Sequence, residues 1–113
     1  MDIERVVARR LMAATGIKCV LDVPADRPEE FACVTLASTG GGRFTRSPRV
    51  AVTCWAATRR RALEMAEAVE RACGAIEDEP NVFQALPDGL YRWDDPETGT
   101  PRYQTNIDIK TCE

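Results

Sequence analysis

The chain has 113 residues and no histidine, and its 15 basic and 18 acidic side chains leave a net charge of −3. This length fits one domain over residues 1–113, and the lack of histidine excludes Ser–His and Cys–His nucleophile pairs and His-ligated zinc. No apolar run approaches the roughly 18 residues of a membrane span, and no apolar h-region follows the N-terminus, so we expect a soluble intracellular domain without membrane contact.

The first half of the chain predicts one helix followed by three strands. Apolar residues at helical spacing predict a helix over 3–15, with Asp2 as its N-cap and Gly16 at its end. A segment over 38–48 contains three consecutive glycines and is expected to be an eleven-residue loop. Alternating or apolar runs predict strands on either side of it, over 17–23, 31–37 and 49–56.

The second half predicts a longer helix over 58–73 and a C-terminal strand over 102–111. In that strand Gln104 and the other even-numbered residues are expected to face solvent. Two shorter strand pieces, 82–86 and 90–93, precede it. The order α-β-β-β-α-β-β predicts an α+β fold, in which two helices pack on one face of an antiparallel or mixed sheet of about four to five strands.

The five cysteines show no spacing typical of a metal or redox site. No CxxC or other close pair occurs, and an odd number without a signal peptide points to free thiols in a reducing compartment. Most lie in apolar runs, where cysteine packs as a small hydrophobic residue. We expect free, inert thiols, with no metal and no cofactor, at Cys19, Cys33, Cys54, Cys73 and Cys112.

Charge is divided unevenly along the chain. Between Glu30 and Glu64 there are six arginines and no acidic residue, whereas 77–97 holds seven acidic residues against Arg92 alone. Such segments can bind nucleic acid, meet each other on neighbouring subunits, or form two solvated faces. The arginines at 59–61 fall in the first turn of a helix, where the macrodipole disfavours cations, which hints at an external partner.

Two local motifs are candidate chemical sites. The run Gly40-Gly41-Gly42 could cradle phosphate, but no Gly-Lys-Ser/Thr follows and the segment leads into a strand. Asp94, Asp95 and Glu97 could chelate a cation or supply paired carboxylates, yet they lie in a proline-glycine turn where Asp commonly binds backbone N–H groups. Neither motif predicts an enzyme, and no sequence-reading nucleic-acid motif is present.

Several runs together resemble the tail terminator, or tail-to-head joining, proteins of long-tailed phages and prophages. These are the residues at 23–31, 39–42 and 50–56, and the turn and strand start at 95–104. The resemblance implies a non-enzymatic ring, usually hexameric, that caps the tail tube, ends its polymerisation and docks on the head connector. It also implies assembly in the host cytoplasm, a final place in the virion tail, and non-specific contact with DNA passing through the ring.

A ring needs two different patches on each subunit, and the basic stretch 43–61 and the acidic stretch 77–97 are natural complements. We expect the 39–49 loop to be the working surface, poorly ordered in an isolated subunit and ordered in the ring. The alternatives are a nucleic-acid-binding module using the basic patch and a small enzyme using the carboxylates. The expected interface residues are Gly40, Gly41, Gly42, Arg43, Phe44, Arg46, Arg59, Arg60, Arg61, Asp94, Asp95 and Glu97.

Overall fold

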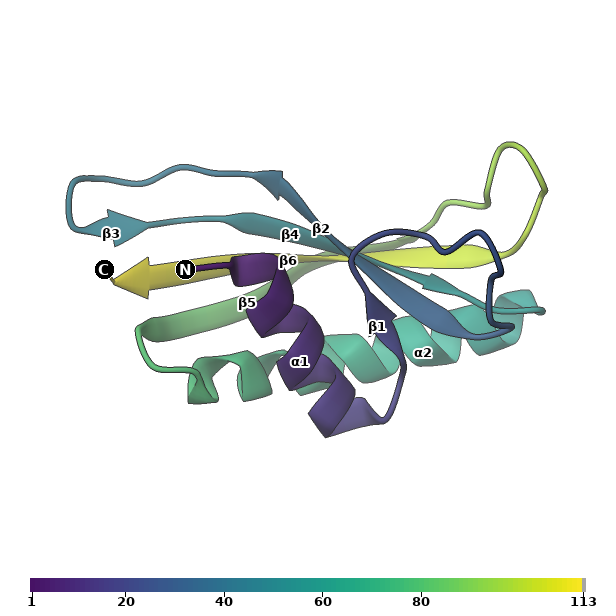
Figure 1. The fold of residues 1–113 in the computed structure, drawn as a ribbon, viewed down its shortest axis with the longest axis horizontal. Helices are drawn as coiled ribbons and strands as arrows, with labels where there is room; N and C mark the ends of the chain where they lie inside the picture. Colours follow the sequence, from purple (N-terminus) through teal and green to yellow (C-terminus); the bar gives the residue numbers. More distant parts are fainter. Residues whose placement is uncertain (113) are drawn as a thin grey trace.

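Two helices cover one face of a mixed sheet in the computed structural model, which describes residues 1–112 (Figure 1). This arrangement confirms the expected α+β fold. A short 3-10 helix, η1, follows the second helix, and the sheet has six strands of very unequal length. The elements are α1 (Ile3–Thr15), β1 (Cys19–Val20), β2 (Phe31–Ser38), β3 (Thr45–Arg46), β4 (Arg49–Trp55), α2 (Arg59–Ala72), η1 (Cys73–Asp78), β5 (Val82–Arg92) and β6 (Arg102–Cys112).

The two α-helices begin and end at the expected residues, within one position. The Asp2 carboxylate accepts the amide of Arg5, and Gly16 ends α1 in the left-handed conformation with φ 76°. The Thr58 hydroxyl accepts the amide of Arg61 at the start of α2. Each helix buries one apolar stripe against the sheet, namely Ile3, Val6, Val7, Ala8 and Leu11 in α1 and Ala62, Met65, Ala66 and Val69 in α2. No helix among residues 1–112 is long and apolar enough to cross a membrane.

Strand β6 lies between β4 and β5, and β2 and β1 complete the sheet beyond β4. Strand β3 pairs with the end of β6 in the same register as β4, because Arg46 lies opposite Thr111 and Arg49 opposite Asp108. The carbonyl of Pro48 accepts the amide of Ile109 at 3.0 Å between the two pairs. Residues 45–55 therefore run along β6 as one strand with a brief interruption.

The expectation of an eleven-residue loop over 38–48 is wrong. The amide of Ser47 donates to the carbonyl of Gly40 at 2.9 Å, and Gly41 forms an antiparallel bridge with Arg46. Residues 39–48, the arm, thus prolong the hairpin of β2 and β4 past a register shift near Leu36, and only a short turn remains at the tip. A hairpin formed within one chain contradicts the expectation that this segment is poorly ordered before assembly.

Three other expectations need correction. The strand expected over 17–23 is limited to Cys19–Val20, where it pairs in parallel with β2. The strand pieces expected over 82–86 and 90–93 form one strand, β5. A register shift between Pro87 and Leu90 places one extra residue of β5 opposite β6, and Gly89 takes φ 103° there. Gln104 is buried, because Tyr91 and Thr53 beside it on the helix-free face bind its amide.

Both edges of the sheet are closed by glutamates from the helical elements. The Glu4 carboxylate accepts the amide of Leu36 at 2.6 Å on β2, where the short β1 no longer covers it. The Glu77 carboxylate accepts the amide of Ala85 at 2.9 Å on β5, and Pro87 beyond it has no N–H to offer. Such devices block the pairing of a sheet edge with another chain.

All five cysteines are free, as expected, but they differ in exposure. Burial raises the pKa of the Cys19 thiol to about 11, of Cys54 to about 12 and of Cys73 to about 11. Burial also raises the pKa of the half-buried Cys33 thiol, whereas Cys112 is exposed. The expectation of inertness therefore has a structural basis for four thiols, and Cys112 departs from it.

We predict that a disulfide-exchange reagent at pH 8 modifies the exposed Cys112 rapidly, and the buried Cys19, Cys54 and Cys73 only after denaturation. Reaction requires the thiolate, and the buried thiols form it only as the pH approaches 11. Mass spectrometry of the modified protein gives the site. Rapid modification of Cys19, Cys54 or Cys73 in the folded protein would contradict the described packing.

We predict that Gly41→Ala loosens the arm while Gly42→Ala does not. A Cβ at position 41, where φ is 118°, would lie 2.5 Å from the Thr45 carbonyl oxygen and 2.7 Å from the Arg46 Cα, whereas a Cβ at position 42 meets nothing within 4 Å. Hydrogen exchange of the Ser47 amide should speed up by about tenfold or more in the first variant, since such strain costs about 1–3 kcal/mol. Equal exchange rates in the two variants would argue against the hairpin.

Candidate functional site

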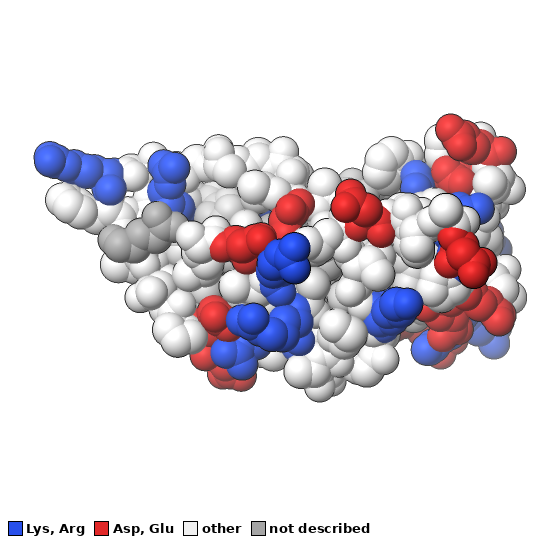
Figure 2. Space-filling view, viewed as in Figure 1, with Lys and Arg blue, Asp and Glu red and all other residues white. Residues whose placement is uncertain are grey.

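The residues expected at the interface lie at two opposite ends of the molecule. The arm forms one end of a long axis of 42 Å, and the start of α2 and the 93–101 turn lie at the other (Figure 1). Basic side chains mark the arm end, and acidic side chains gather over the turn (Figure 2). No acidic residue separates the six arginines between Glu30 and Glu64 in the sequence, but in the structure these arginines do not form one patch.

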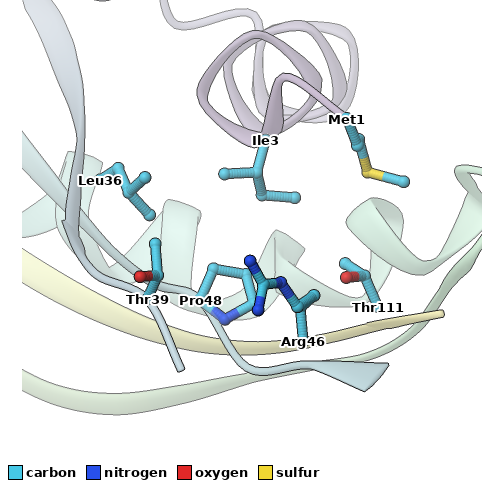
Figure 3. A pocket seen from close by; sticks show the side chains of 7 residues that line it. All are labelled: Met1, Ile3, Leu36, Thr39, Arg46, Pro48 and Thr111. Carbon is cyan, nitrogen blue, oxygen red and sulfur yellow. The ribbon is translucent and has the colours of Figure 1, made fainter. Parts of the chain in front are cut away.

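Phe44 and Arg43 form the tip of the arm. The Phe44 side chain is 70% exposed, and the Arg43 guanidinium carbon lies 5.5 Å from its ring centre. Arg46 lies further back, on the helix side, where it lines a cavity of about 180 Å³ beneath the arm (Figure 3). The other lining residues of that cavity are Met1, Ile3, Leu36, Thr39, Pro48 and Thr111.

The arginines at the start of α2 are only partly available to a partner. Arg61 is paired with Glu30 at 2.8 Å, which raises the pKa of the guanidinium, and Arg59 and Arg60 are exposed beside it. Arg49, from the same basic stretch of sequence, is held on the surface of the sheet by ion pairs with two aspartates. The exposed cations of the stretch are therefore split between the arm and this helix start.

The acidic turn is tied to arginines of its own chain. Arg92 pairs with Asp94 at 2.6 Å, and its hydrogen bonds hold the pKa of that carboxyl below its ordinary value. Asp95 accepts the Thr98 hydroxyl at 2.6 Å, which is the main reason why its pKa is also low, and Arg102 lies 4.0 Å away. Catalytic carboxylic acids need a raised pKa, so this pair is poorly suited to proton donation.

No group of three or more potential metal ligands occurs within residues 1–112. Glu97, the third acidic residue of the turn, is exposed. The turn is better suited to meeting a basic surface than to chelating a cation.

The structure adds a groove that sequence reasoning missed. It has a volume of about 320 Å³ and lies on the helix-free face of the sheet, next to the 93–101 turn. Trp93 at its rim is 52% exposed. Both tryptophans of the chain line it, and the strand pattern already placed Trp55 opposite the core residues, a signal that could have revealed it. The lining residues are Val23, Cys33, Thr35, Ala51, Thr53, Trp55, Trp93, Arg102 and Gln104.

A stack of aromatic and guanidinium groups builds this end of the groove. Trp55 stacks on Phe31 with ring centres 5.3 Å apart, and the guanidinium carbons of Arg27 and Arg102 lie 5.0 and 4.9 Å from the Trp55 ring centre. Arg102 also lies over Trp93 at 4.6 Å and donates to its carbonyl oxygen at 2.6 Å. These contacts fix the turn against the sheet.

The indole Nε1 of Trp55 is buried without a hydrogen-bond partner within the described residues. Buried donors are nearly always satisfied in folded proteins. This N–H is therefore an exception within the described residues, and it is not exposed to the groove.

No model of a known protein family matches the chain, and no curated protein matches it significantly. The resemblance to tail terminators therefore rests on the sequence runs themselves.

We predict that Asp95→Asn lowers stability at neutral pH and that the difference from the parent narrows as the pH falls below about 4. The Asp95 carboxylate has a lowered pKa in the folded chain, so its stabilisation is present above the unfolded pKa and is lost as the pH falls through the folded one. Thermal melts from pH 7 to 2 measure this. Glu97→Gln, at an exposed position of the same turn, is the control for the loss of one charge. An Asp95→Asn curve parallel to the parent would refute the assignment.

Proposed function

We propose that the chain is a structural tail protein of a long-tailed phage or prophage, which forms a ring, caps the tail tube and joins the tail to the head connector. The observation that carries the proposal is the presence of unlike surfaces at opposite ends of one axis. The arm end is basic and carries the exposed Phe44, and the far end carries an acidic turn and an aromatic groove. A ring of identical subunits needs two such complementary patches.

The shape of the arm supports the same proposal. Its hairpin extends past the helices, because β3 continues β4 along β6. The bond from the Ser47 amide to the Gly40 carbonyl joins the two sides of the arm, and the bond from the Ile109 amide to the Pro48 carbonyl ties the arm to β6, so the apolar tip is held out from the body. A preformed arm reaches a neighbour at a lower entropic cost than a free loop does.

We propose a structural rather than a catalytic role, in the virion tail after assembly in the host cytoplasm. Asp94 and Asp95 of the turn are paired with arginines, and the pKa values of these two carboxyls are lowered. The nucleic-acid alternative needs one continuous basic surface. The division of the exposed arginines between two ends, with acidic groups beside one of them, favours protein partners.

We predict that the parent protein forms rings that cap tubes when mixed with the tube protein of the same phage genome, and that Phe44→Ala/Arg46→Ala does not. Both side chains are exposed on the arm, so folding should be retained within roughly half a kcal/mol. Negative-stain images report tube length and ring-shaped ends. Arg71→Ala, an exposed arginine at the other end of α2 from Arg59, is the control and should cap tubes as the parent does.

Two results would contradict the proposed function. One is a parent protein that leaves tube ends bare and tube length unregulated. The other is tight binding of DNA or RNA that weakens steeply with salt, which is the behaviour expected of the nucleic-acid alternative.

A further inference from the structure

The groove on the helix-free face has the features of a receptor for an aromatic side chain next to a cation. Trp93, 52% exposed, and Val23, 43% exposed, offer apolar surface at its rim, and Thr35 and Ala51 form a floor of small side chains. Arg102 is the charged residue of its lining, and Asp94, which pairs with Arg92, follows Trp93 in the acidic turn. Exposed apolar surface framed by charge is typical of interaction sites.

The tip of the arm has the complementary features. Phe44 is the most exposed large apolar side chain of the described chain, and the Arg43 guanidinium stacks on it. The glycine at position 42 keeps the backbone beside them free of side-chain bulk, and its Cβ position is open. The tip thus presents one ring, one cation and bare backbone.

The tip cannot reach the groove of its own chain, because the two lie toward opposite ends of the 42 Å axis (Figure 1). A basic tip and an acidic rim attract each other only between different molecules (Figure 2). The contact joins unlike patches, so it is head-to-tail, and it leaves a free arm and a free groove on every pair.

We propose that the arm tip of one copy, with Phe44 and Arg43, inserts into the groove lined by Trp55 and Trp93 of a second copy. This inference specifies the subunit contact of the ring and rests on the proposed function for its biological meaning. Phe44 packs on the exposed indole of Trp93, and Arg43 lies toward the acidic turn.

The test is sedimentation velocity over a wide range of concentration, with one variant on each side of the contact. Phe44→Ala removes the ring from the tip. Thr35→Arg puts a cation on the groove floor, at an exposed position of β2, and a thermal melt checks that this variant folds. Each variant should associate at least about 30-fold more weakly than the parent, as expected for an anchor at the centre of an interface.

Mixing the two variants gives a sharper result. Phe44→Ala retains an intact groove and Thr35→Arg retains an intact arm, so a one-to-one mixture should form heterodimers that grow no further. Phe83→Ala is the control, because Phe83 is 55% exposed on β5 and does not line the groove. It should associate as the parent does.

Three results would overturn the inference. They are a parent protein that stays monomeric throughout, variants that associate as the parent does, and a mixture that stays monomeric although the parent associates. Capping of tubes by Phe44→Ala alone at parental efficiency would refute the contact and leave the function standing. Heterodimers in the mixture, together with failure of the parent to bind tubes, would support the contact and refute the function.

Discussion

The structure depends on the pairing of β6 with strands on both of its sides along its length. On one side β4 and β3 follow a single register, and on the other β5 follows β6 through two register shifts. Ile107 and Ile109 in the middle of β6 are almost fully buried beneath the helices, and the Thr105 hydroxyl donates to the Ala66 carbonyl of α2 at 3.3 Å. Because β6 runs past the end of the helical layer, its far end supports the arm.

The contacts at the two edge strands of this sheet explain why partners are expected at the two ends of the molecule and not along those strands. Glu4 occupies the amide of Leu36 on one edge, and Glu77 occupies the amide of Ala85 on the other. A sheet with both edges blocked is protected from indiscriminate strand pairing. The surfaces left for a specific partner are the arm tip and the groove at the opposite end, which differ in charge and in shape.

Electrostatics follow the fold rather than the order of charges along the chain. Arg49 belongs to the basic stretch of sequence, yet it bridges Asp88 of β5 and Asp108 of β6 with distances of 2.8 and 2.6 Å. Arg102 lies outside that stretch, yet it stacks between the two tryptophans at the far end. Pairing across strands brings together residues that are distant in sequence, so a count of charges by segment does not locate a patch.

The sequence by itself determined the two α-helices, the strands β2, β4 and β6 and the α+β class, because each of these depends on local signals. Asp2, Gly16 and Thr58 cap the helices through contacts within a few residues, and the alternation over 102–111 needs only the period of a strand. The expected tip of the working surface, with Arg43 and Phe44, also lies exposed as the composition suggested.

Only the tertiary structure decided that the glycine segment is a hairpin arm, because its order comes from the hydrogen bond of Pro48 with Ile109, 61 residues away in sequence, and from the register of β3 on β6. The tertiary structure also decided where the groove lies and which residues line it. Trp55 and Trp93 meet through Arg102 of a third strand, and such long-range pairing leaves no periodic trace in the sequence. Local patterns report the backbone that a residue prefers, whereas a site assembled from several strands depends on which strands become neighbours.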